Sequence, residues 1–392
     1  MSAIGGKCVA AAEINEACIQ TYKANFPDTP IFGDISLKHT HEAIPEFDLL
    51  CAGFPCQPFS KAGKRLGFKD ESRGKLFFSI LEILDNHKEV KGFIFENVKN
   101  LADNKNFWET ICTELKKRNF IITEEPLILS PSDFDIPQKR QRVFILGIKQ
   151  KYCNKKLHPY PKIIEEDLNL SRSQCSGNSA FSILNTEVNE SFIIPKDKEE
   201  ALFSWDEFRE GTKIKTIGFP IWLSHFGIGI NKDSEVFEKL EMESMPGWKQ
   251  NYLKNNRHFY QMHRKFIDIW VEKHHMLSRN KLLQKFEWNC GGDVANIKGG
   301  LIQIRQSGVR VKRPNLFPTL VAMQNTPIIW DKKLNHFRWI TPKEAAKLQS
   351  FASSFKFIGT NNQTYKQLGN AVNVEIAKQL GKGLLNLINQ ED

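Results

Sequence analysis

The fold is decided by the stretch Phe47-Asp48-Leu49-Leu50-Cys51-Ala52-Gly53-Phe54-Pro55-Cys56-Gln57-Pro58-Phe59-Ser60. Its first half is apolar and predicts a strand over 47–52 that is buried on both faces. Its second half cannot continue that strand, because two prolines flank a cysteine. We therefore expect Cys56 on a rigid loop at the carboxyl end of a strand, where wound sheets bind their ligands.

Strand-like and helix-like patterns alternate around this stretch. Three further short apolar runs predict strands at 8–12, 93–95 and 143–146. Apolar residues at helical spacing predict helices between them, over 76–84 and 107–115. This alternation predicts an α/β protein with a doubly wound, mostly parallel sheet.

Composition narrows the class of protein. The chain has 392 residues, of which 41% are hydrophobic and 26% charged, so a disordered or fibrous chain is excluded. The net charge of +10 favours an anionic partner without choosing one. No apolar run has the length of a membrane span, and the first residues carry no export signal, so we expect a cytoplasmic protein without a membrane partner. The eight cysteines form no C-x-x-C pair, and we expect no metal site.

The texture changes after about residue 151, where polar stretches replace the alternation. A helix is predicted near 257–276 within a basic, aromatic-rich segment, which alone is most simply an amphipathic helix with a solvated face. Helices return at 342–350 and 374–388. We predict the first part of one domain at 1–155, a smaller second domain at 156–309, a return segment and hinge at 310–350, and the last part of the first domain at 351–392.

Chemistry-bearing residues lie directly after two of the predicted strands and directly before a third. A cysteine on a loop is usually structural, a glutamate after a strand is often a helix cap, and a basic run is usually solvated. Here, however, Cys56 follows one strand, Glu96 follows the next, and the run containing Arg140 and Arg142 precedes another. A nucleophile, an acid and paired arginines in this order favour an active site.

The chain resembles the bacterial DNA (cytosine-5)-methyltransferases of restriction–modification systems over nearly its whole length outside 155–300. The resemblance is carried by the Pro55-Cys56-Gln57 loop, Glu96-Asn97-Val98, Gln138-x-Arg140-x-Arg142 and Gly369-Asn370-Ala371-Val372-Asn373. Weaker matches lie at 70–78, 310–321 and 338–351. The resemblance implies that 1–155 and 351–392 form the catalytic and cofactor-binding domain and that 156–309 is the target-recognition domain.

The resemblance implies a reaction in which Cys56 adds to C6 of a flipped-out cytosine in double-stranded DNA and a methyl group passes from S-adenosyl-L-methionine to C5. Glu96 would hydrogen-bond the base at N3 and its exocyclic amine, and Arg142 with Arg140 would bind near the cytosine carbonyl and its phosphate. The implied contacts with DNA are Gln57, Ser60, Lys64, Arg73 and Thr319. The implied cofactor-binding residues are Glu13, Ile14, Asp34, Ile35, Pro55, Leu76, Asn370, Ala371 and Val372.

The amino-terminal region departs from the family pattern. The family has a strand, a Phe-x-Gly-x-Gly-Gly turn and a helix before the strand that ends in Glu13, whereas only six residues separate Gly6 from Glu13 here. A parallel crossover needs about a dozen residues or more, so we expect the first βα unit to be absent. An upstream start, a unit supplied by another chain and a decayed gene are all compatible with this expectation.

Two functions compete at this stage. The first is a sequence-specific DNA (cytosine-5-)-methyltransferase that protects host DNA from a cognate restriction endonuclease, acting as a monomer without a stable complex with that nuclease. The alternative is a truncated, catalytically inactive, sequence-specific DNA-binding protein. A methyltransferase acting on tRNA is a more distant option, because the long insert before Thr319 favours a duplex.

Overall fold

The computed structural model describes residues 1–54, 75–153, 162–173, 175, 180–213, 216–228, 244–321 and 325–389. The chain divides into two compact units. Unit 1 comprises Met1–Asn178, Pro318–Met323 and Ala345–Asp392, and unit 2 comprises Ser179–Phe317 and Gln324–Glu344. The predicted second domain, 156–309, therefore begins and ends earlier in the chain than unit 2 does.

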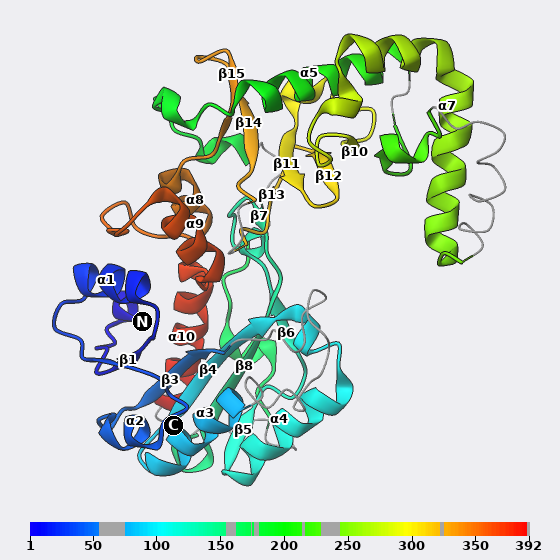
Figure 1. Cartoon of the computed structure of the whole chain (residues 1–392). Helices are drawn as coiled ribbons and strands as arrows, with labels where there is room; N and C mark the ends of the chain where they lie inside the picture. Colours follow the sequence, from blue (N-terminus) through cyan, green and yellow to red (C-terminus); the bar gives the residue numbers. More distant parts are fainter. Residues whose placement is uncertain are drawn as a thin grey trace. The chain divides into compact units, whose positions relative to one another are not determined.

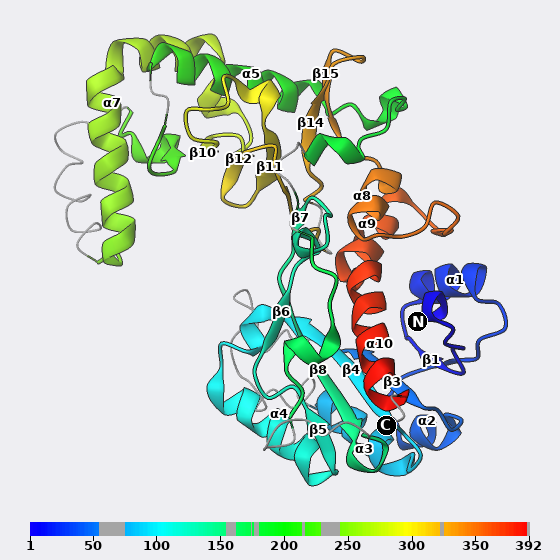
Figure 2. The same ribbon diagram turned by 180° about the vertical axis from the view of Figure 1, so that it is seen from behind.

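Unit 1 is an α/β layer structure (Figures 1 and 2). Its strands are β1 (Ala11–Ala12), β2 (Ile31–Phe32), β3 (Leu49–Gly53), β4 (Gly92–Val98), β5 (Phe120–Ile122), β6 (Leu127–Leu129), β7 (Gln138–Lys139) and β8 (Arg142–Lys149). Its helices are α1 (Glu16–Asn25), α2 (Lys38–Ala43), α3 (Lys75–Asn86), α4 (Lys105–Lys117), α9 (Asn361–Asn370) and α10 (Val374–Asn389). Two elements, β13 (Phe317–Pro318) and α8 (Pro342–Leu348), lie where the chain passes between the units.

The main sheet of unit 1 has the strand order β3-β4-β8-β5, and β6 also pairs with β8. Only β3 and β4 run parallel in it, whereas β8 is antiparallel to β4, β5 and β6. The α/β class is confirmed, but the sheet is mixed rather than mostly parallel. The apolar run of β8 predicted burial correctly and could not predict direction, because side chains alternate with the same period of two in either orientation.

Alternating side chains of the central strands fill two cores, one on each face of the sheet. Phe93 and Phe95 of β4 pack with α3 and α4, whereas Ile94 packs with α10. This two-sided burial explains why β4 and β8 are continuous apolar runs. Gly147 of β8 is required by this packing, since a Cβ there would lie 2.2 Å from the Phe93 ring.

Helices α1, α4 and α9 begin at residues whose side chains satisfy free backbone N–H groups. Asn15 accepts a hydrogen bond from the Cys18 N–H at the start of α1, and Asn104 accepts one from Phe107 at the start of α4. Thr360 and Gln363 form a reciprocal capping box at the start of α9.

Unit 2 contains a six-stranded sheet with the order β15-β14-β11-β12-β10-β9. Its strands are β9 (Ile221–Trp222), β10 (Lys285–Asn289), β11 (Leu301–Arg305), β12 (Gly308–Lys312), β14 (Ile328–Asp331) and β15 (His336–Trp339), and its helices are α5 (Lys196–Gly211) and α7 (Gly247–Lys273). The predicted helix near 257–276 thus begins ten residues earlier, and its backbone is kinked at His263.

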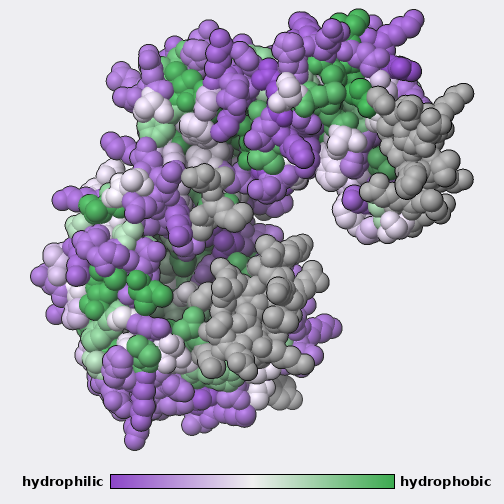
Figure 3. All heavy atoms as spheres, viewed as in Figure 1, coloured by the Kyte–Doolittle hydropathy of each residue, from purple (hydrophilic) through white to green (hydrophobic). Residues whose placement is uncertain are grey.

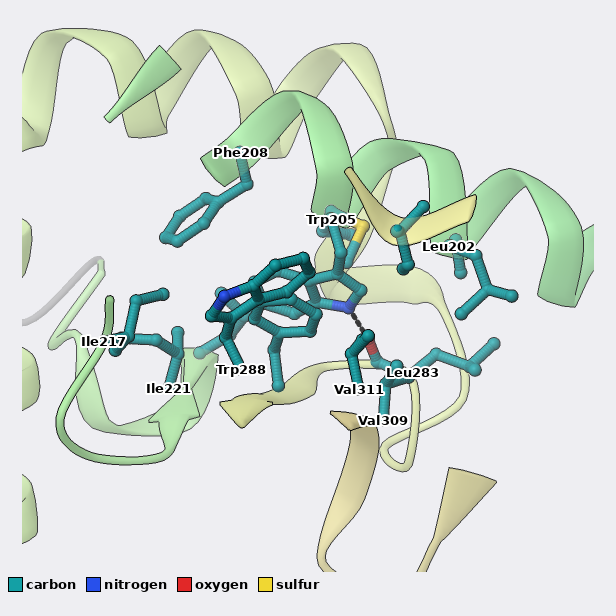
Figure 4. Close-up of a cluster of buried hydrophobic side chains, with 14 of the residues drawn as sticks. Leu202, Trp205, Phe208, Ile217, Ile221, Leu283, Trp288, Val309 and Val311 are labelled. Carbon is teal, nitrogen blue, oxygen red and sulfur yellow. Dashed lines mark hydrogen bonds between the residues drawn. The ribbon is translucent and has the colours of Figure 1, made fainter. Parts of the chain in front are cut away.

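Aromatic side chains dominate the core of unit 2 (Figure 4). Trp205 of α5 is completely buried, stacks on Phe286 with ring centroids 4.9 Å apart, and donates a hydrogen bond of 2.8 Å from Nε1 to the Leu283 carbonyl. This arrangement buries the indole without leaving its N–H unsatisfied.

The surface drawn in Figure 3 is mostly hydrophilic, with hydrophobic side chains gathered in smaller patches. Among the described helices, none combines the length and the apolar character that crossing a bilayer demands. The described residues also contain no group of three or more His, Cys, Asp or Glu side chains placed to hold a metal ion.

Candidate active site

An ion pair lies where β4 ends and β8 begins. The Arg142 Nε lies 3.0 Å from the Glu96 Oε1, and the two side chains are only 17% and 15% exposed. The antiparallel register places Val98 opposite Arg142 and Glu96 opposite Phe144, so both charged residues occupy the same edge of the sheet. The structure therefore brings together two of the four residues predicted to be catalytic.

Burial disfavours the charged form of the Glu96 carboxyl, although Arg142 lies beside it. Desolvation raises the pKa of its carboxyl above the usual value, and the charges of Arg142 and Arg140 only partly oppose that shift. A carboxyl group whose pKa is raised by burial holds a proton more readily than a solvent-exposed one, and it can donate that proton to a bound group.

The chain that leaves β3 is tied to this pair. Gly53 lies opposite Glu96 in the parallel register, and a Cβ on Gly53 would lie 3.4 Å from the Glu96 Oε2. The Asn97 side chain donates a hydrogen bond of 3.1 Å to the Phe54 carbonyl. The last described residue before the loop is therefore anchored beside the carboxyl group.

Six predicted site residues lie outside the described residues, in the stretch 55–74. They are Pro55, Cys56, Gln57, Ser60, Lys64 and Arg73. Their predicted roles stay predictions, and Cys56 is separated from the anchored Phe54 by one residue of sequence.

Arg140 is placed differently from Arg142. Its guanidinium is buried and donates hydrogen bonds to three backbone carbonyls, at 2.7 Å to Leu320, 2.9 Å to Gly369 and 3.0 Å to Ala371. Desolvation, and then the charge of Arg142, lowers the pKa of Arg140 to about 9. The sequence leads us to expect that both arginines bind near the substrate. In the structure, the Arg140 guanidinium holds the segment at Leu320 and the segment at 369–371 in place.

Thr319 is held in the same region. Its hydroxyl donates a hydrogen bond of 2.8 Å to the Lys139 carbonyl, one residue before Arg140. The segment around Thr319 therefore lies against the end of β7, next to Arg140.

The acids predicted to bind the cofactor lie at the carboxyl ends of β1 and β2, which form a parallel pair. The Glu13 Oε1 accepts hydrogen bonds of 2.8 Å from the N–H groups of Ile14 and Asn15. Asp34 accepts one from the Ser36 N–H, which lowers the pKa of its carboxyl. Both carboxylates are thus held in place, and such acceptors suit the hydroxyl and amino groups of an adenosine.

The remaining predicted cofactor residues are distributed over several elements. Ile14 is 72% exposed, Ile35 packs against the core under α3, and Leu76 is half-buried at the start of α3. Asn370 is the last residue of α9, and Ala371 and Val372 lie in the connection to α10. Ala371 is the member of this set whose carbonyl Arg140 holds.

One edge of the sheet is open beside these residues. The strand pair β1–β2 is a separate two-stranded sheet, and within the described residues β3 pairs only with β4. Cys51 of β3 is exposed, although its neighbours on β4 are buried. The described residues fit the adenosine part of a nucleotide cofactor.

Three residues that were assigned no individual role from the sequence hold segments of the site in place. Asn97 anchors Phe54, the Ser130 Oγ accepts a hydrogen bond of 3.1 Å from the Arg140 N–H, and the Asn373 Oδ1 accepts bonds from the first N–H groups of α10. Asn97 and Asn373 stand inside the recognised motifs, which was a usable signal, whereas nothing in the sequence marked Ser130.

Unit 1 thus has an α/β sheet with the desolvated pair of Glu96 and Arg142 at one edge. The family model of the C-5 cytosine-specific DNA methylases matches residues 1–386. The chain therefore belongs to the C-5 cytosine-specific DNA methylase family, whose members use S-adenosylmethionine.

Individual relatives agree with this assignment. The Type II methyltransferase M.NlaIV of Neisseria lactamica is 30% identical over 97% of this chain and 93% of its own length. M.HpaII of Haemophilus parainfluenzae is 45% identical over 165 residues, which are 41% of this chain and 45% of that protein. With M.HpaII and with M.DsaV of Dactylococcopsis salina, the match thus spans less than half of the relative's length.

Solved structures share the fold. The S. pombe Dnmt2 methyltransferase superposes with a TM-score of 0.56 at 16% identity, covering 99% of this chain and 94% of that one. The Spodoptera frugiperda DNMT2 mutant gives a TM-score of 0.51 at 19% identity, covering 98% and 94%.

Proposed function

We propose that this chain transfers a methyl group to C5 of a flipped-out cytosine within a specific short sequence of double-stranded DNA. The observation that carries the proposal is the desolvated Glu96 carboxyl, paired with Arg142 at 3.0 Å and adjoining the point where the chain enters the Cys56 loop. Family membership supports the class of reaction, and this geometry supports a role for Glu96 and Arg142.

The proposed reaction begins with attack of the Cys56 thiolate on C6 of cytosine, because C5 itself is a poor nucleophile. Glu96 hydrogen-bonds N3 and the exocyclic amine, and its raised pKa favours the protonated form that stabilises the adduct. Arg142 binds near the cytosine carbonyl, where a planar guanidinium offers paired donors. S-Adenosylmethionine supplies the methyl group, after which loss of the C5 proton and of the thiol restores the ring.

Cofactor binding is assigned to the carboxyl edge of the sheet. Glu13 and Asp34 would hold the ribose hydroxyls and the adenine amine, with Ile14, Ile35, Pro55, Leu76 and the 370–372 connection lining the site. Arg140 acts as a positioning residue here, because it fixes the Ala371 carbonyl and the Leu320 carbonyl through one guanidinium. Gln57, Ser60, Lys64, Arg73 and Thr319 are proposed to contact DNA.

The proposed cellular role is protection of host DNA from a cognate restriction endonuclease, in the cytoplasm, by a monomer that forms no stable complex with the nuclease. The relatives named above are Type II methyltransferases, which supports this setting.

The test is expression of the chain in a host that lacks cytosine methylation, followed by bisulfite sequencing of the host genome. We expect 5-methylcytosine at one short motif, and none after Cys56→Ser, whose product should still bind DNA. A fully unmethylated genome, from a soluble wild-type protein that binds DNA, would favour the inactive DNA-binding protein. Methylation that persists in Cys56→Ser would remove Cys56 as the nucleophile.

A further inference from the structure

A cluster of aromatic and basic side chains lies in unit 2 around Trp222. Trp222 ends β9, and its ring lies 4.8 Å from the His225 ring and 6.2 Å from the Tyr252 ring of α7. The Lys285 Nζ of β10 lies 5.1 Å from the centroid of the same indole. Three elements therefore converge on Trp222.

The backbone around this cluster is fixed. The Trp222 N–H donates a hydrogen bond of 2.9 Å to the Asn256 side chain, which in turn donates to the carbonyls of Pro220 and Tyr252. Asn256 is completely buried, so β9 and α7 are bonded to each other through a side chain shielded from water.

Two polar atoms of the cluster lack a partner. The Trp222 Nε1 and the His225 Nε2 are buried, and neither forms a hydrogen bond within the described part of the chain. The His225 Nδ1, in contrast, lies 3.3 Å from the Ser224 hydroxyl. An indole N–H can only donate, and buried donors without acceptors are rare in folded proteins, so these atoms point to a missing acceptor.

The charge around the cluster is positive. Lys249, Arg257 and Lys285 all act on His225 electrostatically, and with desolvation as the larger cause they lower the pKa of its imidazole. Among the ion pairs of the described residues, none involves Lys249 or Lys285, although both side chains are half-buried. Cations that are partly desolvated and lack a carboxylate favour an anion.

We propose that Trp222, His225, Lys249 and Lys285 bind a phosphate group of the DNA backbone. This inference rests on the proposed function, which makes duplex DNA the anion available to unit 2. A phosphate offers several acceptor oxygens to donors that arrive from β9, α7 and β10, and it offsets the charge of the lysines. Arg257, from the same face of α7, adds to the positive field.

Occupation of the site should also protonate His225. A neighbouring phosphate favours the imidazolium, and the cations that disfavour it in the free protein are Lys249, Arg257 and Lys285. Binding therefore takes up a proton, and the affinity for DNA should rise as the pH falls from 8 to 6.

The experiment measures fluorescence anisotropy of a labelled duplex that contains the methylated motif, with the full chain, over a series of salt concentrations. Lys285→Met removes one charge and keeps an apolar chain over the indole. We expect about tenfold weaker binding at 0.1 M salt and a slope of log K against log salt that is smaller by about 0.9.

Two further variants separate the cluster's contacts from its charge. Trp222→Phe keeps an aromatic ring but removes the donor, and it should weaken binding several-fold without changing the salt slope. His225→Gln should abolish the dependence on pH. The matched control is Lys298→Met, since the Lys298 Nζ also lies over an indole of unit 2, 4.0 Å from the Trp330 ring, and it should bind like the wild type.

Binding by Lys285→Met and Trp222→Phe that equals wild-type binding at every salt concentration would overturn the phosphate site, while the proposed function would stand if the wild type methylates DNA. An equal loss of slope in Lys298→Met would also overturn it, because the effect would then be one of overall charge. A wild-type protein that binds no DNA would overturn both proposals.

Discussion

Two buried arginine–carboxylate clusters, one in each unit, differ in how well their charges are compensated. In unit 2 the Arg338 side chain donates to the Asp331 Oδ2 at 2.7 Å and to both oxygens of Glu344 at 2.9 Å. Glu344 also accepts hydrogen bonds from the N–H groups of Thr341, at 2.7 Å, and Asn185, at 2.8 Å. In unit 1 Arg142 and Glu96 form a single ion pair of 3.0 Å.

The pKa shifts show the consequence of this difference. Desolvation opposes the charges of Arg338 and Asp331, but hydrogen bonds outweigh it, so the pKa of Arg338 is raised and that of Asp331 is lowered. For Glu96 desolvation wins and the pKa is raised. Fully compensated charges hold a fold together, whereas a charge left partly uncompensated is available for chemistry.

The largest expected effect is on stability in unit 2. Glu344→Gln leaves the buried Arg338 without a full partner and should lower the free energy of unfolding by about 3–5 kcal/mol, measured by urea denaturation. The control is Glu42→Gln, which breaks an exposed pair with Lys38 at 3.7 Å and should cost at most about 0.5 kcal/mol. If both variants lowered the free energy of unfolding equally, the buried, compensated pair would be no more important for stability than the exposed one.

The next effect is on catalysis in unit 1. Glu96→Gln should slow methylation by about 10²–10⁴-fold, because it removes the proton donor to the base. Glu344→Gln should lower the free energy of unfolding. Glu96→Gln should instead raise it at a pH above the raised pKa of Glu96, because it removes a desolvated charge. A raised carboxyl pKa stabilises the fold below the ordinary value of 4.5, and this contribution is lost as the pH rises through the raised pKa. The wild type should lose this stability on alkalinisation and Glu96→Gln should not. Rapid methylation by Glu96→Gln would contradict the assignment.

A smaller effect is expected at acidic pH. Because the pKa of Asp331 is lowered, its contribution to stability is present above the ordinary value of 3.8 and is lost as the pH falls below it. Tryptophan fluorescence should report a loss of about 1–3 kcal/mol in the wild type, and a flatter profile for Asp331→Asn, which already lacks the charge. Identical acid profiles for the two proteins would show that Asp331 is not compensated as described.

Sequence predicted the parts of this picture that depend on local pattern. The apolar runs located β3, β4 and β8, and the order of motifs located Glu96 and Arg142 on one sheet edge. The direction of β8 was not predictable, because burial on both faces leaves the same pattern in parallel and antiparallel strands.

Contacts between distant segments escaped the sequence altogether. Arg140 holds carbonyls 180 and 229 residues away, and a carbonyl acceptor has no signature in the identity of its residue. The cluster at Trp222 is equally hidden, since β9 is two residues long and its pairing with β10 depends on the tertiary structure.

The most direct test of the central claim is a measurement of the Glu96 carboxyl pKa. The chain is labelled with carboxyl-¹³C glutamate, the resonance of Glu96 is assigned by its loss in Glu96→Gln, and its chemical shift is followed by NMR against pH. We expect the pKa of the Glu96 carboxyl to lie above 4.5 and to rise further when Arg142→Met removes the adjacent charge. A pKa at or below 4.5 would contradict this expectation, because the Glu96 carboxyl would then be as well compensated as that of Asp331.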